Sequence, residues 1–453
     1  MRRAVTVLSF LPRRFASKKA RARQEEAECT VVQLASRNAP RAQRLYGFGF
    51  AATGALGVRS LVRPKRAKEV PLPVQRFAMR LPFFAHQWLQ VRAVSCGYGF
   101  TVFVCREDGG EWTLYGCGLN SESQLGLQPR CTRGEVEGHY VELVEEPQPI
   151  DVPLSSDKEN APEDVACGRA HTLFYTTNGQ LYSLGSNCFG QCGREVIAGE
   201  QFRSSRIVSR VHVGFEDAED RIADIVCGQD HSLVLTKRGH VFSFGLGSDG
   251  QLGLGHFDNV SVPCRVRGAI ETSKIRQISS RGDTVLAVCD AGHVYGWGNS
   301  EYNQLSKSEI QLSEPQRLFE GVELGHVSQV AASGSMCAVL NTEGRVFVWG
   351  FGALGLGPRV SLLEAPRMLP PPLFGANEYD PEARVVAIAA GLHNFLALNN
   401  RGTLFSWGAN RSGCLGLAHD DDQSFPLRVT VPAEVKSMRC GVDHMIIMTR
   451  AFA

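Results

Sequence analysis

Short stretches of alternating apolar and polar residues recur along most of the chain. The pattern is clear at 240–244 (His-Val-Phe-Ser-Phe) and 345–349 (Arg-Val-Phe-Val-Trp), each bounded by turn-forming residues. A period of two places every second side chain on the same face and therefore predicts β-strands. Long helical periodicity is absent between about residue 44 and residue 450. We therefore predict an all-β fold.

The predicted strands belong to a repeated phrase with two halves. The first half is Cys-Gly-x-x-His at 167–171, 227–231 and 440–444, with degraded copies at 96–97, 280–281, 332–333 and 390–391. The second half is an apolar or aromatic residue and Gly, followed by Gly-x-Leu-Gly. Its leading glycines are Gly49, Gly118, Gly185, Gly245, Gly298, Gly350 and Gly408. Each half thus occurs seven times.

The spacing of the leading glycines indicates the architecture. Successive glycines are 69, 67, 60, 53, 52 and 58 residues apart, with about four short strands in each unit. Periods of this length built from short strands are typical of β-propellers.

The two ends of the chain carry complementary halves of the phrase. The second half comes first, in a half-blade at 44–57, and the first half comes last, at 435–449. Joined, they complete a seventh blade and cover two sheet edges that would otherwise be exposed. We therefore predict a seven-bladed propeller closed by pairing of the N- and C-terminal half-blades.

The repeated residue types have structural explanations. Glycine at the strand ends allows a positive φ at little cost. Leu252 and Leu415 are expected to fill gaps between blades, and the repeated cysteine is a small apolar filler. His171, His231 and His444 are expected to be buried hydrogen-bonding residues.

The phrase resembles the repeat of the regulator of chromosome condensation family, and more narrowly its mitochondrial branch. The resemblance covers roughly 44–450 and is carried by 167–172, 189–193, 227–232, 296–302 and 440–445. It implies a seven-bladed propeller with about four strands in each blade. Some copies depart from the pattern: 280–284 lacks Cys and His, His393 comes one place early, the exit after Gly350 is short, and Ser306 replaces a closing glycine. The ring is therefore expected to be asymmetric.

The N-terminus has the composition of a mitochondrial transit peptide. The chain has 453 residues and a formal charge of +2, but its first 24 residues hold eight basic residues and no acid. Without those eight, 40 basic residues remain against 46 acidic ones. We predict a transit peptide at 1–24, a linker at 25–43 and the propeller at 44–453. The alternative is a basic arm that binds nucleic acid or a membrane surface.

The most basic segment outside the N-terminus is 59–80, which has one acidic residue. Its basic residues are Arg59, Arg63, Lys65, Arg66, Lys68, Arg76 and Arg80. We interpret the segment as a Pro-containing loop on one face of the ring. It is the candidate contact for RNA phosphates or an acidic protein. The alternative is a solvated loop, since aromatic residues for base stacking are sparse.

The sequence gives no basis for a catalytic, cofactor or metal site. The G-x-G-x-x-G matches at 245–250 and 350–355 fall on the repeat and are not expected to open a helix, as a dinucleotide site requires. The Cys-Gly-x-x-His pairs are spread over separate blades and do not make four close zinc ligands. The 14 cysteines show no compact disulfide spacing, so we expect reduced thiols.

The family resemblance implies two functions. The first is a non-catalytic scaffold in the mitochondrial matrix that acts with large-subunit ribosomal RNA and RNA-modification or assembly proteins, with at most peripheral association with the inner membrane. The second is guanine nucleotide exchange on a mitochondrial dynamin-related fusion GTPase. A chromatin role is weaker because the chain without its N-terminus is acidic, and no DNA partner is expected.

Overall fold

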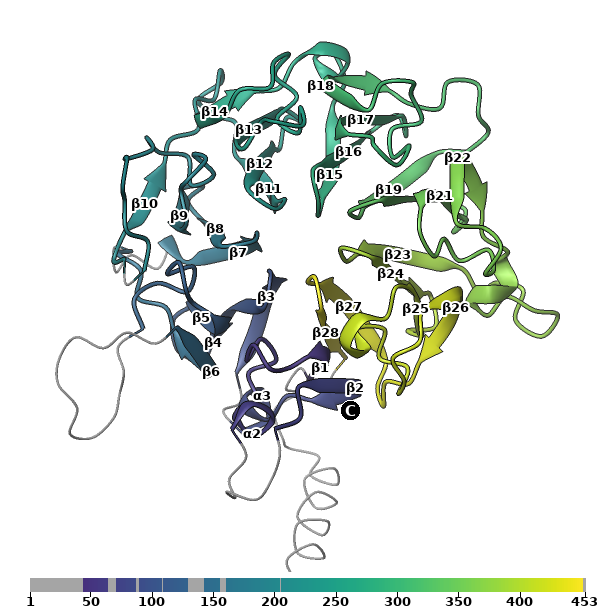
Figure 1. Ribbon diagram of the computed structural model, residues 1–453, viewed down its shortest axis with the longest axis horizontal. Coiled ribbons are helices and arrows are strands. Elements are labelled where there is room, and N and C mark those ends of the chain that lie inside the picture. The colour runs from purple at the N-terminus through teal and green to yellow at the C-terminus, as the bar shows by residue number, and fades with distance from the viewer. Residues whose placement is uncertain are drawn as a thin grey trace, which may run out of the picture. The chain divides into compact units, whose positions relative to one another are not determined.

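Residues 44–63, 71–86, 89–107, 109–128, 142–154, 160–203 and 205–450 are described by the computed structural model. In this part of the chain, seven four-stranded antiparallel sheets stand around a central channel (Figure 1). The predicted all-β seven-bladed propeller is confirmed. No helix in the described ranges has the length and apolar character to cross a membrane.

Six blades are continuous meanders whose first strand lies innermost. The first blade has β3 (Gln90–Cys96), β4 (Phe100–Arg106), β5 (Thr113–Leu119) and β6 (Leu143–Pro149); the second has β7 (Pro162–Cys167), β8 (His171–Thr176), β9 (Leu181–Gly185) and β10 (Val208–Val211). The third has β11 (Ile222–Cys227), β12 (His231–Thr236), β13 (Val241–Gly245) and β14 (Val260–Arg265); the fourth has β15 (Ile275–Ser280), β16 (Thr284–Cys289), β17 (Val294–Asn299) and β18 (Gln311–Arg317). The fifth has β19 (Val327–Ala332), β20 (Met336–Asn341), β21 (Val346–Phe351) and β22 (Leu362–Met368); the sixth has β23 (Val385–Ala390), β24 (Asn394–Asn399), β25 (Leu404–Gly408) and β26 (Gln423–Val429).

The seventh, closing blade joins the two ends of the chain. Its order from the channel outward is β27 (Val435–Cys440), β28 (His444–Thr449), β1 (Arg44–Phe50) and β2 (Val74–Arg80). Tyr46 lies opposite Ile447, and Phe48 lies opposite Met445. The predicted pairing of the chain ends is confirmed, with two strands from each end.

Two expectations about this region were wrong. The N-terminal half-blade does not end at residue 57, because β2 is its second strand. The segment 59–80 is therefore not a loop: it contains the short helix α2 (Arg59–Val62) and the outermost strand of the closing blade. The remaining helical elements are α3 (Pro82–His86), η2 (Gly268–Ile270), η3 (Pro371–Phe374) and η4 (Arg411–Gly413).

Most joints between blades are packed by a large side chain from the third strand, whereas the joint between the closing blade and the first blade has Cys117 at this position. Trp297 is fully buried and lies so close to Gly253 of the preceding blade that a Cβ there would approach its ring to 2.8 Å. At the chain ends, Phe48 packs on Gly416 in the same way, at 2.9 Å from such a Cβ. The seam therefore has the same packing as the covalently continuous joints. Leu252 and Leu415 are completely buried, as predicted.

The three repeated histidines each tie their blade to the next one. The Nε2 atoms of His171 and His231 lie 3.1 Å from the hydroxyls of Ser232 and Ser280, and that of His444 lies 2.8 Å from Thr101 Oγ1. All three imidazoles are buried, which confirms their predicted role. In the sixth blade the corresponding position holds Asn394, directly after the displaced His393.

Candidate functional site

The described part of the basic segment is bound to the neighbouring blades. Arg59 and Arg63 both contact Glu145 on β6 of the first blade, with Nε–Oε distances of 3.2 and 2.6 Å. Arg76 on β2 binds Asp420 of the sixth blade through two hydrogen bonds of 2.6 and 2.8 Å. These residues therefore brace the closing blade from both sides.

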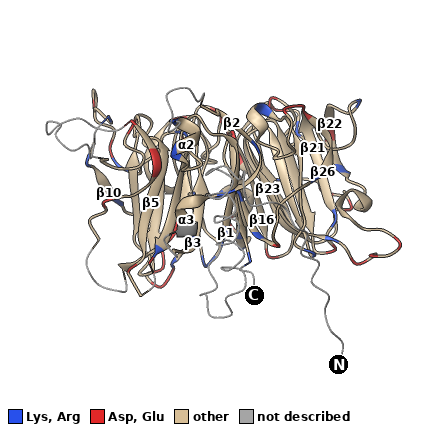
Figure 2. Ribbon diagram, turned by 90° about the horizontal axis from the view of Figure 1, so that it is seen from below, with Lys and Arg blue, Asp and Glu red and all other residues tan. Residues whose placement is uncertain are grey.

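The rest of this segment adds little to a phosphate site. Arg80 lies at the end of β2 and is exposed to solvent. Burial of part of its side chain, followed by repulsion from the nearby Arg44, lowers the pKa of its guanidinium. Lys65, Arg66 and Lys68 lie outside the described residues. Figure 2 shows Lys and Arg interspersed with Asp and Glu at both ends of the strands. The described residues thus contain only part of the predicted basic cluster. Three of its arginines, Arg59, Arg63 and Arg76, are paired with carboxylates.

A second charged cluster lies on the turn face, the face formed by the turns 97–99, 168–170, 228–230, 281–283, 333–335, 391–393 and 441–443. There the carboxylate of Asp230 pairs with Arg169, and that of Asp283 accepts hydrogen bonds from the amides of Gln229 and Gln251 at 3.2 and 3.4 Å. Burial, and after it the carboxylates of Asp249 and Asp230, raises the pKa of Asp283 to about 6. Asp230 and Asp283 together are called the acidic rim; Asp230 is buried and paired, so Asp283, which is half-buried, is its main group available to a basic protein surface.

Sequence reasoning missed the acidic rim, although a signal was present. Asp230 and Asp283 occupy the position immediately before the residue that begins the second strand of their blades. Asp443 has the same position before His444 in the closing blade. The signal is an acid that recurs at one turn position of the array; in the structure Asp230 is buried, and Asp283 and Asp443 are half-buried.

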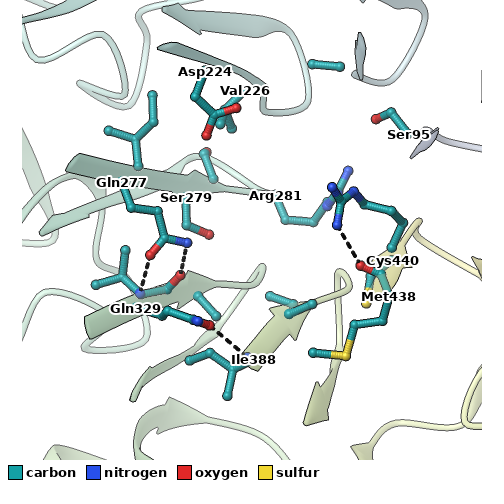
Figure 3. A pocket seen from close by; sticks show the side chains of 18 of the residues that line it. Ser95, Asp224, Val226, Gln277, Ser279, Arg281, Gln329, Ile388, Met438 and Cys440 are labelled. Carbon is teal, nitrogen blue, oxygen red and sulfur yellow. Dashed lines mark hydrogen bonds between the residues drawn. The ribbon is translucent and has the colours of Figure 1, made fainter. Parts of the chain in front are cut away.

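The central channel forms a cavity with a volume of about 550 Å³. The seven innermost strands line it, and polar side chains connect one strand to the next (Figure 3). The Gln277 amide accepts from the N–H of Val330 at 2.9 Å and donates to its C=O at 3.3 Å. The Gln329 amide joins the fifth blade to the sixth by donating to the Val386 carbonyl and accepting from the Ile388 N–H, both at 3.0 Å. These amides satisfy backbone groups on strand edges that face the channel.

Charged groups of both signs also line the channel. Burial, followed by repulsion from Asp164, raises the pKa of Asp224 to about 7. Arg281 Nη1 donates to the Cys96 carbonyl at 3.1 Å, and Arg439 Nε donates to the Val94 carbonyl at 3.1 Å. Because Val94 and Cys96 are two residues apart on β3, the two carbonyls that bind these guanidiniums lie roughly 7 Å apart along the strand.

The repeated cysteines and histidines belong to the core. Burial raises the pKa of Cys96, Cys167 and Cys440 to about 12, and lowers that of His171 to about 3. These thiols are therefore protonated and unreactive at neutral pH. Among the described residues, no group of three or more His, Cys, Asp or Glu is placed to hold a metal ion. Neither G-x-G-x-x-G match opens a helix: turns and then β14 or β22 follow.

Comparison with known families identifies the class of protein. The profile of the RCC1-like domain matches residues 39–370, and profiles of the regulator of chromosome condensation (RCC1) repeat match 385–414 and 401–448. The chain therefore belongs to the RCC1 family of propellers.

Individual relatives narrow the assignment within the family. The chain is 42% identical over 436 residues to the mouse RCC1-like G exchanging factor-like protein, covering 95% of this chain and 92% of that protein. The human protein of the same name is 42% identical over 433 residues. The crystal structure of human WBSCR16 superposes with a TM-score of 0.82 at 41% identity, over 90% of this chain and 100% of that one. Yeast Prp20p, at 18% identity and a TM-score of 0.70, shares the fold.

Proposed function

We propose that the chain is a non-catalytic binding platform that acts in mitochondria during assembly of the large ribosomal subunit. The observation that supports a binding platform is the match to an RCC1-like relative along 92% of that relative's length, and the ribosomal part of the proposal rests on the family resemblance and the basic segment. A closed ring with buried thiols and imidazoles supports a role in binding rather than in bond breaking. Its inter-blade loops are displayed on a rigid scaffold, where partners are commonly bound.

The proposed RNA contact is the exposed end of the basic segment. Although both pair with Glu145, the Arg59 and Arg63 side chains keep 62% and 67% of their surface exposed. Exposed ion pairs contribute little stability, so a phosphate can replace the carboxylate at small cost. Lys65, Arg66 and Lys68 follow directly in the sequence and add three positive charges.

Crosslinking and sequencing of RNA bound to the tagged protein in mitochondria tests this proposal. We expect enrichment of large-subunit ribosomal RNA, and a several-fold loss when Lys65, Arg66 and Lys68 are changed to Glu. Arg345→Glu is the control, because Arg345 is an exposed arginine on another blade, in the turn between β20 and β21. Absence of ribosomal RNA, or equal loss in the control, contradicts the RNA role.

The second candidate is guanine nucleotide exchange, which the name of the mouse and human relatives supports. Exchange requires a surface that grips a GTPase and weakens its hold on phosphate and magnesium, and it needs no nucleophile. The acidic rim of Asp230 and Asp283 can contribute to such a grip. The test is the GDP release rate of a dynamin-related fusion GTPase at saturating protein, for the wild type and the Asp230→Asn/Asp283→Asn variant. An unchanged rate with the wild type rejects exchange for that GTPase.

The mitochondrial location rests on the eight basic residues among the first 24. Sequencing the mature N-terminus from cells tests it. A start near Ala16 or beyond is expected for a processed matrix protein. An intact Met1 would contradict import with cleavage.

A further inference from the structure

The outermost strand of every blade exposes a free edge, and most of these edges are protected by proline. Proline stands in β6, β14, β18, β22 and β26, at Pro147, Pro149, Pro263, Pro315, Pro366 and Pro426. In each of these strands one proline lies at the bulge that interrupts the register with the third strand. Because proline cannot donate a hydrogen bond and a bulge twists the edge away, such strands resist pairing with another chain.

The closing blade protects its edge by another device. Ala78 of β2 occupies the place that proline has in the five strands above. Here the bulge is covered from the sixth blade: Phe77 forms a bridge with Leu417, and the Ala418 N–H donates to the Arg76 carbonyl at 2.8 Å. Six of the seven outer edges in the described structure therefore carry an obstacle to strand addition.

The remaining edge, β10, has neither form of protection. Its four residues pair with β9 in unbroken register, with Ser209 opposite Ser183. By this register Val208 stands where the other blades have proline. The strand and its flanks, 206–213, read Arg-Ile-Val-Ser-Arg-Val-His-Val, which is rich in β-branched residues and contains no acid. β10 lies on the outer rim of the ring (Figure 1).

Two free arginines give this edge a charge preference. Arg206 and Arg210 are exposed, and neither forms an ion pair within the described ranges, whereas nearby Arg203 pairs with Glu142. Arg210 lies in β10 and Arg206 lies two residues before the strand begins, so both positive charges lie beside this edge. Arg265 of the third blade and Arg317 of the fourth blade occupy the position of Arg210 in their outermost strands. Both are paired, with Glu216 and Glu320 respectively.

We propose that the edge of β10 is a docking site for an extended acidic segment of a partner protein, which adds to the second blade as a fifth strand. Main-chain hydrogen bonds supply the affinity, and carboxylates opposite Arg206 and Arg210 supply the selectivity. A second copy of this chain fits less well, because its edge carries the same positive charges. The inference goes beyond both proposed functions and does not depend on either.

The shortness of β10 sets the expected strength of the contact. Four residues offer only a few main-chain hydrogen bonds, and each exposed cross-strand charge pair adds little to the affinity. The complex is therefore expected to be weak and sensitive to salt. Such an edge suits transient recruitment of a partner protein.

The probe is a short fluorescent peptide of alternating glutamate and valine, titrated into the full-length protein and followed by anisotropy. We expect saturable binding, with slower hydrogen exchange of the 206–212 amides, and no binding of a lysine–valine peptide. Val208→Pro introduces the residue that five other blades accept at this place, so the ring should fold while binding falls at least ~10-fold. Arg206→Glu/Arg210→Glu, which leaves the backbone edge intact, should cause a similar loss, about 1.4 kcal/mol.

The matched control is Arg428→Glu, since Arg428 occupies the place of Arg210 in the sixth blade, where Pro426 blocks the edge. This variant should bind like the wild type. The proposal is overturned if Val208→Pro binds normally, if the lysine peptide binds equally well, or if exchange slows elsewhere instead. It is equally overturned if Val208→Pro turns a dimer into a monomer by light scattering, because the occupant would then be a second copy.

Discussion

The Tyr98 hydroxyl donates a hydrogen bond of 3.3 Å to the Arg281 carbonyl across the mouth of the channel. The two residues are 183 positions apart and belong to the first and fourth blades, on opposite sides of the ring. Arg281 returns the contact through its guanidinium, which bonds the Cys96 carbonyl. Because burial raises the pKa of Tyr98, the phenol keeps its proton at neutral pH and remains a donor. The departure from the repeat at Arg281 thus supplies a cross-brace.

Removing this brace should weaken the ring. Arg281→Ala deletes the hydrogen bond to Cys96 and should cost about 1–2 kcal/mol, and Tyr98→Phe deletes one neutral hydrogen bond and should cost about 0.5–1.5 kcal/mol. Both bonds hold the same two turns, so the double variant should lose less than the sum of the single ones. Urea unfolding of all four proteins measures this coupling. Strict additivity would show that the two contacts act independently.

Closure of the propeller should depend on Gly49. The residue has φ +108°, and a Cβ there would lie 2.2 Å from the Asp443 carbonyl oxygen at the seam. Gly49→Ala should therefore cost more than about 3 kcal/mol, because conformational strain and a backbone clash combine. Gly109 is the control, with φ +75° but no atom within 4 Å of the position that a Cβ would take. Gly109→Ala should cost only about 1 kcal/mol. Equal losses in urea unfolding would contradict the steric explanation.

The fold could be predicted from the sequence because its signals are local and repeated. Every blade has a strand-ending glycine such as Gly245, and the complementary halves at the two ends predict the closing blade. The strand β2 was missed because its sequence, with Arg76 and Arg80, shows no alternation. Its place is determined by tertiary pairing, in which Gln75 lies opposite Gly49.

The charged sites could be predicted only in part, for a similar reason. Arg59 and Arg63 are recognisable as basic residues, but their partner Glu145 is more than 80 positions away and belongs to another blade. The brace between Tyr98 and Arg281 exists only because ring closure brings opposite blades together. By contrast, the missing proline of β10 is visible in the sequence once the strand register of the other blades is known.

Acid should destabilise the ring through its buried histidines. Burial lowers the pKa of His171 from 6.5 to about 3. A group whose pKa is lower in the folded state binds its proton more readily in the unfolded state. Its contribution to the free energy of unfolding is therefore complete above pH 6.5 and is lost as the pH falls toward 3. Between pH 7.5 and pH 5 this residue should account for a loss of about 2 kcal/mol.

His171→Asn separates this contribution from other titrations. Asparagine is the natural residue at the equivalent position 394 of the sixth blade, so the site should accept it. The variant is expected to lose less stability than the wild type between pH 7.5 and pH 5, as measured by urea unfolding at both pH values. An identical loss in both proteins would show that His171 does not titrate on unfolding in this range.

Asp224 should have the opposite pH dependence, because its folded-state pKa is raised from 3.8 to about 7. An acid with a raised pKa contributes stability below its unfolded pKa and loses it as the pH rises through the folded value. Asp224→Asn should therefore stabilise the protein near pH 8 by about 1–2 kcal/mol, less than the full shift implies because the side chain is only partly shielded from solvent. Near pH 4 the variant should gain little. Asp258→Asn, with 91% of the side chain exposed, is the control and should change stability at neither pH. Equal effects of Asp224→Asn at both pH values would mean that the channel does not hold this carboxyl protonated, and that the substitution acts through packing.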